Sequence, residues 1–193
     1  MTARLTRGRF LWAGAAAAGG AAAALRGAGG ASDAAQPGAR DEEILRFFLT
    51  LEQIQQSFYR QAVDLARLDG ELLELAHRFG EQEGRHAALL AERLGGAAPQ
   101  PPDSDFGDAF DSPERFRDAA IELEETALAG YVGQAGNLGR ETMGAVARLV
   151  SVEARQVAWL RDLAGISPAP RAADPARKAE AVLGELRDKG YLV

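Results

Sequence analysis

Four glutamates of the sequence lie in the middle of apolar helix faces. Each sits among apolar residues spaced three and four positions apart, which is the spacing of a helix face that packs into a protein core. The four are Glu52, Glu83, Glu124 and Glu153. None of the four faces contains a lysine or an arginine, yet a buried carboxylate must either take up a proton or lie beside a positive charge. Because a bound pair of divalent metal ions would neutralise all four, the pattern favours a carboxylate metal site.

Two of these glutamates are followed by a second polar residue three positions later. His86 follows Glu83, and Gln156 follows Glu153. Residues at positions i and i+3 project from the same side of a helix, so each pair can bind one ion together. The chain has two histidines and no cysteine, which excludes thiol catalysis, disulfides, iron-sulfur clusters and cysteine-bound zinc. Carboxylates must therefore supply most of the ligands.

An internal repeat relates the two halves of this pattern. Tyr59 follows Glu52 by seven residues, and Tyr131 follows Glu124 by the same interval. The two halves are thus related helical hairpins, and a pseudo-twofold axis would place their acids symmetrically. For the tyrosines we favour core packing, with the hydroxyl groups satisfied at the bundle end. The alternative is that they donate hydrogen bonds to the carboxylates or act as one-electron relays.

Long amphipathic runs with few breaks predict an all-α fold. The segment between the second and third runs holds three prolines and is too long for a tight turn, so it must be a crossover between two helical hairpins. Asp41 is the predicted N-cap of the first helix. We therefore predict a four-helix bundle with a long crossover between helices 2 and 3, plus a short C-terminal helix. The predicted helices are Asp41–Leu68, Glu71–Leu94, Pro113 to about Leu138, Glu141–Leu163 and about Asp174–Asp188.

The length and the charge limit the remaining classes of function. A chain of 193 residues has room for one domain of ordinary size. The first 31 residues carry four of the 22 basic residues and no acid, which leaves 18 bases against all 28 acids in the rest of the chain. Such an acidic body argues against nucleic acid or anionic lipid as a partner.

The N-terminal 35 residues have the layout of an export signal followed by a linker. A basic start precedes an Ala/Gly-rich run from Phe10 to Leu25, which is short for spanning a bilayer. The hexad Thr6–Leu11 is similar to the twin-arginine motif, with Gly8 in place of the second arginine. The twin-arginine and general secretory routes both stay open, as do an uncleaved membrane anchor and a plain Ala/Gly-rich tail. We expect an exported protein of the periplasm, the cell envelope or the extracellular space, with a bundle over residues 41–165 and a helical appendage over 166–193.

Short motifs on each of the four predicted bundle helices carry a resemblance to a known family. They are Asp41-Glu42-Glu43-Ile44-Leu45 with Leu51-Glu52 and Phe58-Tyr59, Glu83-x-x-His86, Leu123-Glu124 with Tyr131, and Val152-Glu153-Ala154-Arg155. Through them the chain resembles the ferritin-like superfamily, in particular exported bacterial members related to desiccation-associated proteins. The resemblance implies two iron ions, with Glu52 and Glu124 as terminal ligands, Glu83 and Glu153 as bridging ligands and His86 as a terminal nitrogen ligand. Gln156 stands where a symmetric site would have its second histidine, so one metal position should be weaker.

Two classes of function follow from these expectations. The first is a metal-dependent oxidoreductase in which iron reacts with oxygen or peroxide, in oxidative or desiccation stress. Manganese in the same ligands would suit a catalase-like dismutation. The second is a non-catalytic ferritin-like envelope protein whose vestigial site holds protonated acids and water, and which binds a partner or has a structural role. The sequence predicts no catalytic residue and no oligomeric state.

Overall fold

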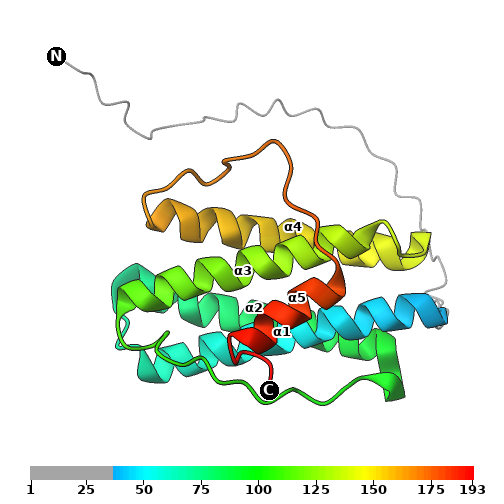
Figure 1. Ribbon diagram of the computed structural model, residues 1–193, viewed down its shortest axis with the longest axis horizontal. Coiled ribbons are helices and arrows are strands. Elements are labelled where there is room, and N and C mark those ends of the chain that lie inside the picture. Colours follow the sequence, from blue (N-terminus) through cyan, green and yellow to red (C-terminus); the bar gives the residue numbers. More distant parts are fainter. Residues whose placement is uncertain (1–36) are drawn as a thin grey trace, which may run out of the picture. The chain divides into compact units, whose positions relative to one another are not determined.

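The computed structural model describes residues 37–193, and over that range the fold is entirely helical. Four long helices lie side by side and a short fifth helix lies outside them (Figure 1). The predicted fold class is confirmed. Within the described range the elements are α1 (Ala39–Leu65), α2 (Gly70–Leu94), a 3₁₀ turn η1 (Gly95–Ala97), α3 (Pro113–Ala135), α4 (Arg140–Leu163) and α5 (Ala179–Asp188).

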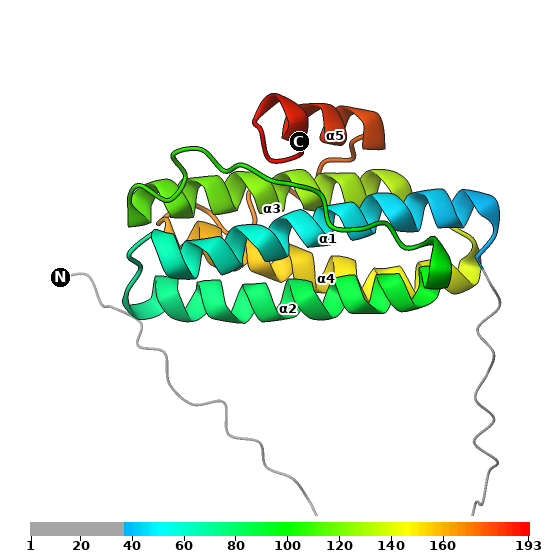
Figure 2. The same ribbon diagram turned by 90° about the horizontal axis from the view of Figure 1, so that it is seen from below.

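The four long helices form two hairpins. Helix α1 packs mainly against α2, and α3 packs mainly against α4. The crossover from α2 to α3 runs along the length of the bundle, and α5 lies on the outer side of α3 (Figure 2). A long connection between two hairpins is the connectivity of ferritin-like folds rather than of a simple up-and-down bundle.

Capping residues set the start of α3 as the sequence predicts. The hydroxyl of Ser112 accepts a hydrogen bond from the backbone N–H of Arg115 at 3.2 Å, and Pro113 occupies the first helical position. Proline is favoured there because its fixed φ suits the helix and its missing N–H would have had no helical partner. The third helix therefore begins at the predicted residue.

The predicted N-cap role of Asp41 is wrong, because Gly38 caps α1 and Asp41 lies inside the first turn. Its carboxylate instead accepts hydrogen bonds from the N–H of Gly139 at 3.0 Å and from the hydroxyl of Thr142 at 2.5 Å. Both groups belong to the start of α4, whose first N–H groups have no partner within the helix. Asp41 thus joins the N-terminus of α1 to that of α4.

Three helix ends differ from the prediction by a few residues. Helix α1 ends at Leu65, three residues early, and Arg67 just beyond it adopts a left-handed φ of 49° that a helix cannot continue through. Helix α3 ends three residues before the predicted Leu138. Helix α5 begins five residues after the predicted Asp174, which precedes Pro175 and is thereby disfavoured from helical geometry.

The crossover is fixed against the C-terminal tail. Phe106 of the crossover contacts Phe58 of α1, with ring centroids 5.2 Å apart, and Tyr191 of the tail at 5.1 Å. The backbone N–H of Asp105 donates to the carbonyl of Gly190 at 3.0 Å. The C-terminal tail therefore packs against the crossover and holds it on the bundle.

The interior faces predicted from apolar spacing are the ones that the bundle buries. Helices α1 and α2 bury Phe48, Tyr59, Phe79 and Leu90 almost completely. The predicted interior positions that stay half-buried are those near helix ends, namely Leu72, Ala135, Leu138 and Leu163. The core is thus continuous through the middle of the bundle, where the four glutamates lie.

Among the helices that the structure describes, none has both the length and the apolar character needed to cross a bilayer. The predicted export signal lies outside the described residues.

Candidate metal centre

The four predicted glutamates meet in the middle of the bundle. Glu52 comes from α1, Glu83 from α2, Glu124 from α3 and Glu153 from α4, and each is 0% exposed. The same periodicity that buries apolar side chains above and below brings these four carboxylates into the core. Such burial is unfavourable for an ionised carboxylate unless a positive charge lies close by.

His86 supplies a nitrogen at the centre of three of these acids. Its Nδ1 lies 3.3 Å from Oε2 of Glu52, 3.0 Å from Oε2 of Glu83 and 3.1 Å from Oε1 of Glu153. Neighbouring ligands of a first-row metal ion, each about 2.1 Å from it, are spaced by about 3.0–3.4 Å. One ligand atom from each of the four residues lies within 4.8 Å of the others. This set could hold a metal ion.

Two tyrosines hold two of the acids across the bundle. The hydroxyl of Tyr59 on α1 donates to Oε1 of Glu124 on α3 at 2.7 Å. The hydroxyl of Tyr131 on α3 donates to Oε1 of Glu52 on α1. The favoured expectation, that these hydroxyl groups are satisfied at the bundle end, is wrong, and the alternative of hydrogen bonds to the carboxylates is confirmed. Each tyrosine crosses to the acid of the other hairpin, as the internal repeat requires.

Gln55 is a site residue that the sequence analysis missed. Its side-chain amide is fully buried and donates to Oε2 of Glu124 at 2.8 Å and to Oε2 of Glu153 at 3.2 Å. The signal was present in the sequence, since Gln55 follows Glu52 by three residues just as His86 follows Glu83.

Gln156 lies at the site as predicted, but its nitrogen faces the acids. The side-chain amide donates to Oε1 of Glu83, and to Oε1 of Gln82 at 3.2 Å. Gln156 therefore neutralises no charge in this arrangement, and serves as a hydrogen-bond donor to an acid. Whether it and the five other predicted residues bind a metal ion stays a prediction.

Burial raises the pKa of every acid in the cluster. The pKa of Glu83 rises to about 8 and that of Glu153 to about 7, first because burial disfavours the charged form and then because the carboxylates repel one another. The same two causes raise the pKa of Glu124 well above its ordinary value and raise that of Glu52. Without a cation the cluster therefore holds protons near neutral pH.

The pKa of His86 is also raised, but for a different reason. Burial alone would lower the pKa of His86, but its hydrogen bonds with Glu153, Glu52 and Glu83 together raise it to about 12. Burial, then the charge of the neighbouring acid, raises the pKa of Tyr59 and Tyr131 well above the ordinary value, so both stay protonated donors. Metal binding must displace the imidazole proton and the protons of the acids.

The composition of the site fits a divalent cation. Four carboxylates and one imidazole converge, and no lysine or arginine lies on the interior faces to neutralise them. Among the described residues, the buried side-chain oxygens of Gln55 and Gln156 accept no hydrogen bond, which is rare for buried polar atoms. Oxygen and imidazole donors are the ligands that iron, manganese and zinc take in proteins.

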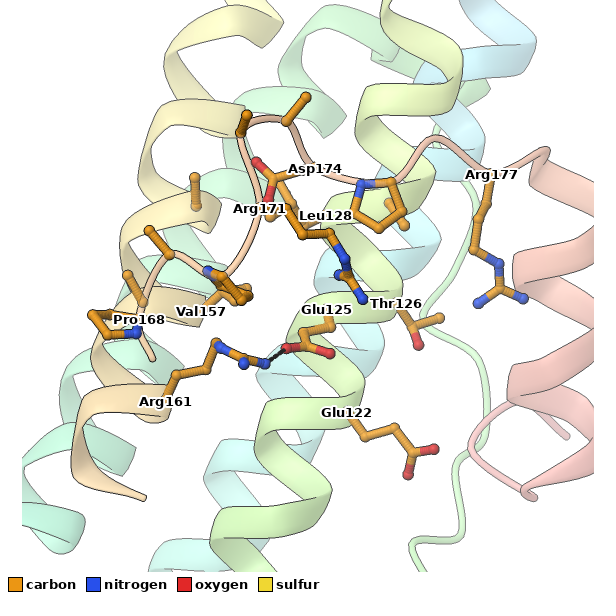
Figure 3. A pocket seen from close by; sticks show the side chains of 18 of the residues that line it. Glu122, Glu125, Thr126, Leu128, Val157, Arg161, Pro168, Arg171, Asp174 and Arg177 are labelled. Atoms are coloured by element: carbon orange, nitrogen blue, oxygen red, sulfur yellow. Dashed lines mark hydrogen bonds and ion pairs between the residues drawn. The ribbon is translucent and has the colours of Figure 1, made fainter. Parts of the chain in front are cut away.

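A separate hollow of about 460 Å³ lies between α3, α4 and the segment that leads to α5. Figure 3 shows Arg161 paired with Glu125 on one wall and Arg177 on the side of α5. The segment is fixed by the N–H of Arg177, which donates to the carbonyl of Ala129 at 2.9 Å. None of the predicted metal ligands lines this hollow, so it is distinct from the acid cluster.

Comparison with known families agrees with this geometry. None of the curated proteins compared with the chain matches it. A family model for the ferritin-like domain matches residues 40–165, which are most of the chain and include all four helices of the bundle. The chain therefore belongs to the ferritin-like domain family.

Proposed function

We propose that this protein is an exported ferritin-like metalloprotein whose buried carboxylate site holds iron for redox chemistry outside the cytoplasm. The observation that carries the proposal is the meeting of Glu52, Glu83, His86 and Glu153 on interior helix faces that carry no lysine or arginine. Bound iron would supply one-electron chemistry with oxygen or peroxide as the oxidant. Manganese in the same ligands would suit dismutation of peroxide. Glu124 and Gln156, the two other residues predicted as ligands, lie in the same cluster and are hydrogen-bonded within it.

The side chains of the site have distinct parts in this function. Glu83 and Glu153 give up protons to bind the cation, and His86 gives up the proton on Nδ1. The hydroxyl groups of Tyr131 and Tyr59 fix the orientation of Glu52 and Glu124. The surrounding apolar faces exclude bulk water, which strengthens every electrostatic interaction inside.

A non-catalytic envelope protein is the second candidate. One observation favours it: the amide groups of Gln55 and Gln156 donate hydrogen bonds to Glu124, Glu153 and Glu83. With protons shared among the acids, the cluster can persist as a polar core. In that case the protein would bind a partner or have a structural role.

Metal content separates the two candidates. The protein is purified without chelator, reloaded anaerobically with Fe(II) and exposed to air, and metal per chain and remaining Fe(II) are measured. Retained iron that oxidises faster than free Fe(II) supports the proposal. Absence of retained metal, together with no thermal stabilisation by Fe(II) or Mn(II), favours the second candidate.

A pair of variants tests the position of the site. The double variant Glu83→Ala/Glu153→Ala removes one acid from α2 and one from α4 and should lose metal binding. The control Glu81→Ala/Asp162→Ala removes an exposed acid from each of the same two helices and should keep it. Unchanged metal content in the first double variant would contradict the assignment.

The proposal of export rests on the N-terminal segment, whose basic start and Ala/Gly-rich run have the layout of an export signal. The resemblance to exported desiccation-related proteins supports it. Expression of the full chain in a bacterium with a twin-arginine pathway, followed by fractionation, should give a shortened protein in the periplasm or envelope. Arg7→Lys with Arg9→Lys should leave the precursor in the cytoplasm, whereas Arg26→Lys should not. A full-length wild-type protein confined to the cytoplasm would contradict export.

A further inference from the structure

The repeat makes the two halves of the site comparable residue by residue. Glu52 on α1 corresponds to Glu124 on α3, and each accepts a hydrogen bond from the tyrosine of the opposite hairpin. His86 on α2 corresponds to Gln156 on α4. In a symmetric site, each half would therefore present the same donors to its own metal ion.

A second departure from symmetry lies one turn beyond the first acids. Gln55 follows Glu52 by three residues, and the residue that follows Glu124 by three is Ala127. Both are buried. The side chain of Ala127 has no hydrogen-bonding group, whereas the amide of Gln55 reaches between Glu124 and Glu153 and donates to both.

In three of the four acids, one carboxylate oxygen faces His86 and the other accepts a hydrogen bond. Glu52, Glu83 and Glu153 each present one oxygen to Nδ1 of His86. Their other oxygens accept hydrogen bonds from Tyr131, Gln156 and Gln55 respectively.

Glu124 differs from the other three acids. Its Oε1 accepts from Tyr59 and its Oε2 accepts from Gln55. No oxygen of Glu124 faces His86 in the described ion pairs, and Glu124 is absent from the group of four whose ligand atoms converge. Three acids thus converge on Nδ1 of His86, and the fourth is bound by the amide of Gln55 and the hydroxyl of Tyr59.

We propose that the protein binds one divalent metal ion per chain, at Glu52, Glu83, His86 and Glu153, and that the amide groups of Gln55 and Gln156 take the place of the second ion. This inference rests on the proposed function, and it assigns that function a mononuclear site with three carboxylates and one imidazole. A carboxamide nitrogen donates hydrogen bonds and does not bind cations, so both glutamines satisfy acids that would otherwise need a metal.

The experiment counts Mn(II) ions bound to the metal-free protein. Bound metal per chain is measured by elemental analysis after equilibrium dialysis, and electron paramagnetic resonance distinguishes an isolated Mn(II) ion from a coupled pair. The wild type should bind one ion with the spectrum of an isolated centre. The double variant Gln55→Ala/Gln156→His, which removes the obstructing amide and supplies the missing imidazole, should bind two ions that are magnetically coupled.

Two further variants serve as controls. Gln53→Ala alters a half-buried glutamine of the same helix that bonds to the carbonyl of Pro99 instead of the acids, and should keep one ion. Ala127→Gln places an amide beside Glu52 by the symmetry of the repeat, and should lose the single ion. Circular dichroism and thermal unfolding check that each variant is folded.

The possible outcomes separate this inference from the function on which it rests. Two coupled ions in the wild type would overturn the mononuclear site but leave the metalloprotein proposal intact. No bound ion in the wild type would overturn both. A folded double variant that still binds one ion would overturn the role of the two amides. If that variant does not fold, the stoichiometry and spectrum of the wild type decide.

Discussion

Replacing Glu83 by glutamine should stabilise the metal-free protein and abolish its stabilisation by metal. The pKa of Glu83 rises from its ordinary 4.5 to about 8 because the side chain is buried among other acids. At pH 7 the folded protein must therefore keep a proton on Glu83 that the unfolded chain has released. Glutamine imitates the protonated acid in shape and keeps an oxygen that can accept from Gln156, but has no proton to take up.

The magnitude follows from the interval between the ordinary pKa and the working pH. Each pH unit between the two pKa values changes the free energy of unfolding by about 1.4 kcal/mol, and about 2.5 units separate 4.5 from pH 7. The wild type therefore loses up to about 3 kcal/mol of unfolding free energy that the Glu83→Gln variant retains. The folded state binds more protons than the unfolded state between pH 4.5 and about 8. Stability of the wild type therefore falls as the pH rises through that window. Below pH 4.5 this difference from the variant vanishes.

Urea unfolding of chelator-treated protein at pH 5 and pH 7 measures this difference. From pH 5 to pH 7, the free energy of unfolding of Glu83→Gln should rise relative to that of the wild type by about 2–3 kcal/mol. Glu81→Gln, an equal change of charge at an exposed position of α2 that pairs with Arg85, should show no such gain. Mn(II) should then reverse the order, because a ligand that binds only the folded wild type raises its free energy of unfolding. Equal pH dependence in the wild type and the Glu83→Gln variant would refute the reasoning.

Three further predictions follow from individual contacts. Tyr59→Phe should lower the free energy of unfolding by about 1–3 kcal/mol in urea titrations, because Oε1 of Glu124 loses its buried donor. Gly133→Ala should detach the segment before α5, because a Cβ at position 133 would collide with the carbonyl of Arg177. Limited proteolysis should then cut that segment. Gly136→Ala, which has open space around it, should leave the segment resistant to the protease. Mn(II) affinity measured by calorimetry should rise by about tenfold or more from pH 6 to pH 7, because binding displaces protons from groups whose pKa values lie at about 7, 8 and 12.

The sequence was sufficient to predict the fold and the four acids, because both depend on periodicity along single helices. The same spacing that places Phe48 and Phe79 in the core places Glu52 and Glu83 there. The repeat then supplied the relation between the two hairpins. None of this required knowledge of how one helix is shifted along another.

The contacts that sequence reasoning missed or did not favour all depend on how one helix is shifted along another. The hydroxyl of Tyr59 reaches Glu124 only because α1 and α3 are aligned so that a residue seven positions beyond one acid lies level with the other. Gln55, which like Tyr59 lies on α1, also donates to Glu124. Asp41 meets the start of α4 because the two helix ends coincide. Spacing within a helix does not determine such axial alignments, which arise from side-chain packing between helices.

The asymmetry of the site is informative because the surrounding frame is symmetric. Both tyrosines, all four acids and the two hairpins obey the repeat, so a general loss of the site would have altered the two halves alike. Instead Glu52, Glu83 and Glu153 each present one oxygen to His86, whereas Glu124 is bound by the amide of Gln55. Each buried acid lowers the stability of the metal-free bundle, and apolar residues of similar size would avoid that loss. A core that keeps three unfavourable acids around one nitrogen and binds the fourth, Glu124, with an amide and a hydroxyl group is the arrangement expected of a protein that holds a single cation.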